Sequence, residues 1–244
     1  MTFTIVARCP ESDLLGICLA TSPLGVASRC PHVRGGVAAI SSQCHSDWRH
    51  GLTGLALAAR GWSPEDILGA IRQKDRFYDY RQIGIVTADG RAAAHSPSKG
   101  AHWTGHRVGE GFVAMGNGLV GPGVVDAIFD SFAGSGDLPF FERLMRAIEA
   151  GGAAGGELIG HKSAGLIASA PGIERPLIDL RIDMANPLPA EGGDAIRDLR
   201  RVFDAYEPLV PYYADRWLDN PEMSSSAYLA MPVAEREKSS ATLW

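Results

Sequence analysis

Short runs in which apolar and polar positions alternate fill much of the chain, and this pattern predicts β-strands. The opening run is rich in β-branched residues and is followed by the turn residues PESD, so a hairpin is expected to begin near residue 1. Asp89-Gly90 joins two further runs and is the clearest hairpin signal in the chain. The segments predicted as strands are TFTIVARC, LLGICLATS, RGGVAAISSQC, the two arms of RQIGIVTADGRAAAHS, GEGFVAMGN, SAGLIASA and PLIDLRID.

Apolar residues at helical spacing separate these groups of strands. One helix is predicted over 51–60, and Ser63-Pro64 marks the start of a second that runs to about Lys74. Two more helices are predicted over 121–136 and 138–152. Hairpins dominate and no repeated βαβ unit is evident. We therefore expect an α+β fold in which two mainly antiparallel sheets pack face to face, with helices outside both: a four-layer α-β-β-α sandwich.

The C-terminal part of the chain has a different character. ANPLPAEGG predicts a linker, which divides the chain into a sandwich domain over 1–185 and a helical extension with an arm over 186–244. The extension carries one apolar helical stripe, made of Ile196, Leu199, Phe203, Tyr206 and Val210. This stripe can pack on its own domain or on a second subunit, and we expect a homodimer.

Composition excludes several classes of partner. The chain has 244 residues and a net charge of −5, without a block of basic residues, so nucleic acids and anionic membranes are not expected partners. No apolar run approaches the roughly 20 residues of a membrane span. The N-terminus does not resemble a signal peptide, so we expect a cytoplasmic protein. The glycines of GHRVGEG lack the strand-to-helix context of a nucleotide site, and we expect no cofactor.

Several segments together resemble a bacterial and archaeal family called domain of unknown function 1028, over roughly residues 1–185. They are MTFTIVARCPESDLLGICLATSPLGVAS, RGGVAAISSQ, GLTGLALAARGWSPEDIL, RQIGIVTADGRAAAHS, WTGHRVGEGFVAMGN and KSAGLIASA. The resemblance implies an N-terminal-nucleophile-hydrolase-like (Ntn) fold, which is the same α-β-β-α sandwich. The family has no assigned reaction, so the resemblance implies a class of mechanism and no substrate.

In that superfamily the nucleophile is the first residue of the mature chain, on the first strand. The resemblance therefore makes Thr2 the candidate nucleophile once Met1 is removed. A free α-amino group, with a pKa of about 7.7–8.0, is partly neutral at cellular pH and can accept the proton of the hydroxyl. A retained Met1 blocks this chemistry, and Thr2 is then an ordinary strand residue.

An acyl-transfer site also needs donors for the developing oxyanion. Gln43 and Asn117 each end a predicted strand and can supply amide N–H groups, although both are also common turn residues. Ser22 ends the second strand, where it can face the first strand or serve only the turn. His106 shares a face with His102 on an extended segment, so both can face one cleft or be solvated.

The segment CHSDWRH, residues 44–50, offers further candidates. His45 and Arg49 are predicted substrate contacts in a loop before a helix. His45, Asp47 and His50 could be metal ligands, but their spacings do not place them on one helical face, and we expect no metal.

Three hypotheses of function follow. The first is a cofactor-independent amidohydrolase of the Ntn type that acts on a small polar metabolite. The second is a non-catalytic Ntn-like protein that binds a ligand or serves as a scaffold. The third is a metal-assisted hydrolase around His45 and His50.

Overall fold

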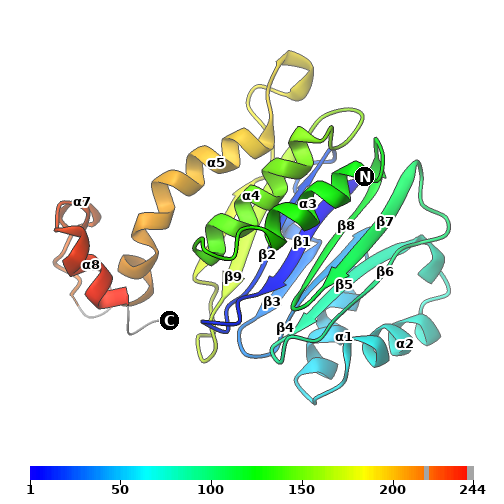
Figure 1. Cartoon of the computed structure of the whole chain (residues 1–244), viewed down its shortest axis with the longest axis horizontal. Coiled ribbons are helices and arrows are strands. Elements are labelled where there is room, and N and C mark those ends of the chain that lie inside the picture. The colour runs from blue at the N-terminus through cyan, green and yellow to red at the C-terminus, as the bar shows by residue number, and fades with distance from the viewer. Residues whose placement is uncertain (217–219, 241–244) are drawn as a thin grey trace. The chain divides into compact units, whose positions relative to one another are not determined.

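Two antiparallel sheets pack face to face between two pairs of helices, as the sequence pattern predicts (Figure 1). The computed structural model describes residues 1–216 and 220–240. The chain divides into two compact units, Met1–Leu199 and Arg200–Trp244. The four-layer sandwich is the first unit, and it is confirmed as an α+β fold.

The larger sheet, sheet A, has the strand order β10-β9-β2-β1-β8-β7. Its neighbouring strands are all antiparallel, which follows from the hairpins of the sequence. Its strands are β1 (Thr2–Arg8), β2 (Leu15–Thr21), β7 (Trp103–Gly109), β8 (Phe112–Leu119), β9 (Ser163–Ser169) and β10 (Ile178–Ile182). The first strand of the chain thus lies inside the sheet, between β2 and β8.

The smaller sheet, sheet B, has the order β3-β4-β5-β6. Its strands are β3 (Pro31–Arg34), β4 (Ala38–Cys44), β5 (Arg81–Thr87) and β6 (Ala92–His95). The Asp89-Gly90 turn joins β5 to β6 as predicted, and Gly90 adopts φ 86° there.

The helices cover the outer faces. Helices α3 (Gly123–Ala133) and α4 (Phe140–Ala153) contact sheet A, while α1 (Trp48–Ala58) and α2 (Pro64–Lys74) contact sheet B (Figure 1). The predicted start of α2 is confirmed, because the Ser63 side chain accepts from the backbone N–H of Asp66. Helix α1 begins three residues before the predicted Gly51, since Asp47 caps it.

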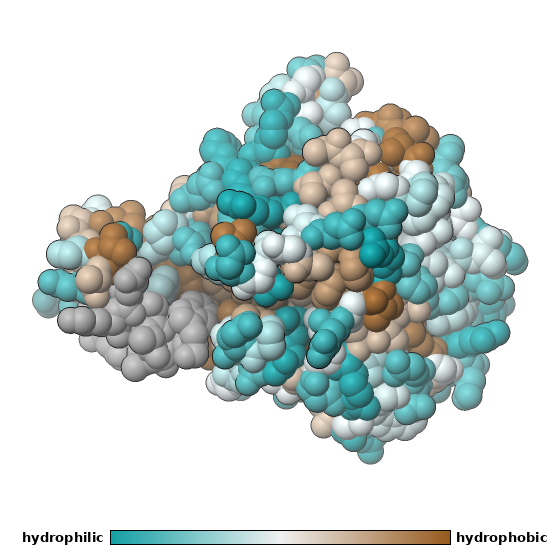
Figure 2. Space-filling view, in the orientation of Figure 1, coloured by the Kyte–Doolittle hydropathy of each residue, from teal (hydrophilic) through white to brown (hydrophobic). Residues whose placement is uncertain are grey.

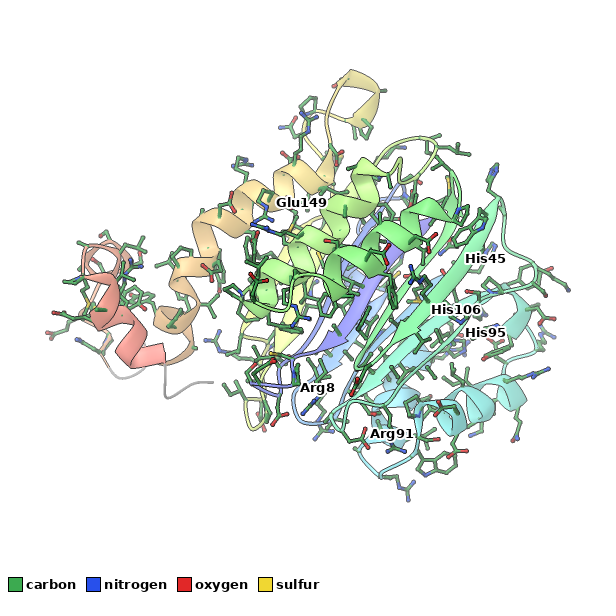
Figure 3. The ribbon with its side chains drawn as sticks, viewed as in Figure 1. Arg8, His45, Arg91, His95, His106 and Glu149 are labelled. Atoms are coloured by element: carbon green, nitrogen blue, oxygen red, sulfur yellow. The ribbon has the colours of Figure 1, made fainter. Side chains whose placement is uncertain are left out.

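The interior between the two sheets changes character along its length. In β1 the residues that face sheet B are Thr2, Thr4 and Val6, and the opposing residues of β4 run from Gln43 through Ser41 to Ala39. Apolar side chains therefore fill one end of this layer, and buried hydroxyl and amide side chains fill the other, where β1 begins. Figure 3 labels Arg8 at the far, apolar end of β1.

Two details of the strands were not predicted. The run RGGVAAISSQC is shorter as a strand than predicted, because its first glycines form a turn and the preceding residues make β3. His106 lies on strand β7, where an extended segment or loop was expected. Residues Trp103 to Gly109 lack a continuous apolar pattern because this strand is at the edge of sheet A and much of it is exposed.

The second unit contains the end of α5 (Ala195–Tyr206) and short helices. The α-helix that carries the predicted apolar stripe ends at Tyr206, before Val210, the last residue of the stripe. It ends there because Pro208 disfavours the α conformation of the residue before it. The predicted arm forms α7 (Ser225–Leu229) and α8 (Val233–Ser240), and its last residues, 241–244, lie outside the described part of the chain. A π-helix spans Tyr212–Arg216. Among the described residues, no helix has both the length and the apolar character to cross a membrane.

Candidate functional site

Thr2 lies at the polar end of the interior, where its hydroxyl contacts Thr21 and the carbonyl of Met1. The residue is 5% exposed, and its Oγ1 is 3.1 Å from Oγ1 of Thr21 at the end of β2. Both hydroxyl groups donate to the carbonyl oxygen of Met1. Because each hydroxyl has one hydrogen, that carbonyl uses the hydrogens of both threonines.

Two amide side chains approach the main chain of Thr2 from the two sheets. Gln43 Nε2, from β4, and Asn117 Nδ2, from β8, are each 3.4 Å from the carbonyl oxygen of Thr2. Each also donates to Oε1 of Gln82 at 2.9 Å. The sequence predicted Gln43 and Asn117 as site residues, and the structure brings both to Thr2.

Gln82, at the start of β5, is the centre of this network. Its side chain is fully buried, and its Nε2 is within 3.0 Å of Ser96 Oγ, of the Gly105 carbonyl and of the Gly116 carbonyl. An amide nitrogen has two hydrogens, so these three acceptors share them. The Gln82 side chain therefore joins both sheets and fixes the orientation of the two amides that reach Thr2.

His106 is connected to the network through Ser96. Ser96 Oγ is 2.8 Å from His106 Nδ1 and accepts from Gln82, so its own hydrogen is directed to the imidazole. This assignment places the proton of the neutral ring on Nε2. Desolvation lowers the pKa of His106, which favours that neutral form. The predicted contact residue His106 is thus linked to Thr2 through three other side chains: Ser96, Gln82, and either Gln43 or Asn117.

On the other side of Thr2, Ser22 belongs to a second buried group of polar residues. Its backbone N–H donates to Glu157 Oε2 at 2.6 Å, and Glu157 is 4% exposed. Burial raises the pKa of Glu157 to about 7, although Ser22, the amino terminus of Met1 and His161 act to lower it. His161 Nδ1 is 3.3 Å from an Asp194 carboxylate oxygen.

Arg49 and His50 lie in the first turn of α1, where a loop was predicted for Arg49, because Asp47 caps the helix before them. Arg49 Nε is 2.9 Å from Asp47 Oδ1, and its side chain is 71% exposed. The hydrogen bonds from Arg49 hold the pKa of Asp47 down at about 2. His50 Nε2 is 3.1 Å from Asp75 Oδ2. Within the described residues, no group of His, Cys, Asp and Glu is placed to hold a metal ion.

His45 lines a surface pocket with Phe77, Tyr80 and Arg81. Its ring packs edge-on against Tyr80, and Figure 3 shows His45, His95 and His106 on the same side of the molecule. Cys44 and Arg81 pair across the strands next to Gln43 and Gln82, so this pocket lies one strand position outside the amide network. No contact recorded in the structure joins His45 or Arg49 to Thr2.

Comparisons with known proteins agree with this architecture. The model of the Family of unknown function (DUF1028) matches residues 2–191. The chain belongs to this family. A crystal structure of protein SPO2555 from Silicibacter pomeroyi, to which the DUF1028 model is also assigned, has a TM-score of 0.74 and 28% identity to the chain. The match covers 84% of this chain and 88% of that one. No curated protein matches the chain.

Five residues of the candidate site were missed by sequence reasoning: Thr21, Gln82, Ser96, Glu157 and His161. Gln82 carried a usable signal, because RQIGIV places a polar residue on the same alternating face as the interior residues of β5. Glu157 had none. It lies in a glycine-rich loop between α4 and β9, and only the folded chain brings it to the end of β2.

The buried Glu157 gives the DUF1028 domain a testable pH dependence. Its pKa is about 7 in the folded chain, against 4.5 for an ordinary glutamate. Between these values the native state holds a proton that the unfolded chain has released, so stability falls as pH rises through this window. We expect the unfolding free energy of the wild-type chain to fall by roughly 2–3 kcal/mol between pH 5 and pH 8, and we expect Glu157→Gln to lack this fall. Denaturant unfolding at both pH values measures this difference. An equal change in unfolding free energy for the two proteins would contradict the prediction.

Proposed function

We propose that the chain is a cofactor-independent amidohydrolase of the Ntn type, with Thr2 as nucleophile and a small polar metabolite as substrate. The observation that supports this proposal most directly is the buried start of β1. Hydroxyl and amide groups from β2, β4, β5 and β8 converge there around Thr2, in an interior layer that is otherwise apolar. Buried polar groups are costly unless they serve structure or chemistry, and their concentration at one strand end favours a site.

Removal of Met1 would change the hydrogen bonds of Thr2 in the direction that catalysis needs. The Met1 carbonyl accepts from both Thr2 and Thr21, and it would leave with its residue. The Thr21 hydroxyl can then donate to Thr2 Oγ1, which is 3.1 Å away, while the Thr2 hydroxyl proton becomes available to the new α-amine. The nucleophile and its base would then belong to one residue.

The proposed reaction has two balanced steps. Thr2 Oγ1 attacks the carbonyl carbon of the substrate, its proton passes to the α-amine, and the C–N bond breaks as that proton is given to the leaving amine. The acyl group is then an ester on Thr2 Oγ1. Water attacks this ester, giving its proton to the α-amine, and the C–O bond to Thr2 breaks as the oxygen is reprotonated.

Gln43 and Asn117 are proposed to hold Thr2 and to stabilise the oxyanion. Their contacts to the Thr2 carbonyl are long, at 3.4 Å, so an anionic oxygen nearby would compete for the same N–H groups. Ser22 and His106 are proposed substrate contacts because Ser22 follows Thr21, whose hydroxyl is 3.1 Å from that of Thr2, and His106 lies at the edge of the amide network. His45 and Arg49 are proposed for outer parts of the substrate.

A non-catalytic ligand-binding protein or scaffold is the second candidate, and one observation favours it. With Met1 in place, its carbonyl uses both threonine hydroxyls and the hydrolytic mechanism cannot operate. Intact-mass analysis of natively expressed protein tests the first requirement, a chain that begins at Thr2. A panel of small amides and ureido compounds, assayed with wild type and Thr2→Ala, tests the second.

We also propose that the protein is a homodimer, in which the C-terminal unit takes part. Ile196 and Leu199 of the apolar stripe are buried within the first unit, so a truncation must spare them. We expect a chain that ends at Tyr206 to be monomeric in size-exclusion chromatography with light scattering, while full-length protein is dimeric. An unchanged dimer after truncation would assign the interface to the sandwich instead.

A further inference from the structure

Three buried polar atoms near the end of β2 lack a hydrogen-bond partner among the described residues. They are Ser22 Oγ, Glu157 Oε1 and His161 Nε2. The three residues are 2%, 4% and 6% exposed, so water does not freely replace the missing partners. Ser22 and Glu157 are joined through the Ser22 N–H, and the nearby Ser22 side chain also lowers the pKa of the carboxyl, yet neither Glu157 Oε1 nor the Ser22 hydroxyl has a hydrogen bond of good geometry. A buried carboxylate in this state is costly, and a cation is the natural group to complete it.

Met1 lies next to residues adjacent to Ser22 and Glu157. Thr21, whose hydroxyl donates to the Met1 carbonyl, precedes Ser22, and Gly118, which the Met1 side chain contacts, precedes Leu119, the β-bridge partner of Glu157. The amino terminus of Met1 lies close enough to Glu157 to interact with that carboxylate electrostatically. Its side chain lies against Gly118, where an added Cβ would be 2.1 Å from Met1 Cγ. Its carbonyl accepts from the hydroxyls of Thr2 and Thr21. Gly118 adopts φ +68°, so both its conformation and the space above it require glycine.

Met1 is also an acyl group attached to Thr2. In the peptide its carbonyl carbon is bonded to the nitrogen of Thr2, whereas in the proposed intermediate an acyl carbon is bonded to Oγ1 of the same residue. Transfer of the acyl group from the nitrogen of Thr2 to Oγ1 of the same residue would convert the first linkage into the second. The position of Met1 therefore indicates where the acyl part of a substrate lies after Met1 has been removed.

We infer that the Met1 position is the acyl subsite of the proposed hydrolase, and that its substrates are amides of α-amino acids whose ammonium group is bound by Glu157 and Ser22. This inference rests on the proposed function for its chemistry, but the subsite can be tested without catalysis. The ammonium group donates three hydrogens, which Glu157 Oε1 and Ser22 Oγ can accept. The acyl side chain lies over Gly118, where a residue of the size of methionine fits.

The loop that carries Glu157 also has exposed apolar residues. Leu158 and Ile159 follow the carboxylate and are 56% and 55% exposed, and Val120, which lies against Gly155 of the same loop, is 48% exposed. Figure 2 shows apolar surface gathered at the upper right, over this loop between α4 and β9. The loop thus presents its one carboxylate to the interior and its apolar residues to solvent.

Binding to a catalytically inert protein tests the subsite. The full-length Thr2→Ala chain is prepared without Met1, as verified by intact mass, and titrated calorimetrically with L-methioninamide and with the same amide lacking its α-amino group. We expect L-methioninamide to bind at least about tenfold more tightly. Glu157→Gln in the same background should remove this preference, and Ser22→Ala should reduce it. Glu110→Gln, a matched change at an exposed glutamate, should leave it intact.

The outcomes separate this inference from the proposed function. Equal affinity for the two amides, or no measurable binding of either, overturns the inference. A preference that survives both Glu157→Gln and Ser22→Ala also overturns it. If the preference is found but the chain that begins at Thr2 hydrolyses neither amide, the subsite stands and the hydrolase proposal fails. If Glu157 served only the α-amine of Thr2, Glu157→Gln would slow turnover of both amides equally, and the inference would be wrong.

Discussion

Thr2→Ala should abolish hydrolysis of every amide that the wild-type protein cleaves, with a fall in kcat/KM of about 10³-fold or more. The reason is that Thr2 is proposed to supply both the attacking oxygen and, through its α-amine, the base. The stability of the fold should change little, since without Met1 the side chain keeps one hydroxyl contact, to Thr21, worth about 1 kcal/mol. Steady-state kinetics with the amide panel, together with thermal unfolding, measures both effects.

Thr2→Ser is the matched variant for this prediction. It keeps the oxygen and the α-amine, and we expect it to retain activity within roughly 10²-fold of wild type, because only the methyl group that restricts the rotamer is lost. A protein with uncleaved Met1 should be as inactive as Thr2→Ala. Full activity of Thr2→Ala, or of protein shown by mass to retain Met1, would refute the assignment of the nucleophile.

Gln82→Leu should be the most destabilising single change among the polar residues of the interior, at about 3–5 kcal/mol of unfolding free energy. Leucine has a similar size but makes none of the hydrogen bonds of the amide. Its introduction leaves the Gly105 and Gly116 carbonyls and the amides of Gln43 and Asn117 without their partner. Each buried group that loses its partner costs about 1–3 kcal/mol, and some relaxation offsets the sum.

Gln73→Leu is the control, because it makes the same substitution at an exposed position of α2. We expect it to change the unfolding free energy by no more than about 0.5 kcal/mol. Urea unfolding of the three proteins gives the comparison. If Gln82→Leu were as mild as Gln73→Leu, the network would not hold the two sheets together, and its part in positioning Thr2 would have to be abandoned.

The candidate site could be predicted from the sequence only in part, and the reason is geometric. Thr2 was found as the residue after Met1 in a chain that resembles the family, and Gln43 and Asn117 were found as the ends of predicted strands. The register places Asn117 opposite Thr2 in sheet A and Gln43 opposite Gln82 in sheet B. His45 and Arg49 were chosen for their chemistry alone. The structure places them at the surface, where Arg49 pairs with Asp47 and His45 packs on Tyr80.

The sequence by itself determined the local elements and their layers. Alternation and turn residues specify hairpins, and helical spacing with caps specifies helices, because both depend on neighbours within a few positions along the chain. The apolar residues on alternating positions of the strands also determined that the two sheets would pack face to face.

Only the tertiary structure decided which polar side chains meet at the start of β1. Gln82 and Glu157 are far from Thr2 in the sequence, and their roles depend on the registers between strands and on a loop path that no local pattern encodes. A side chain's burial, and hence its pKa and its missing partners, is a property of everything packed around it. For that reason the buried carboxylate of Glu157, on which the substrate class depends, emerged from the folded chain alone.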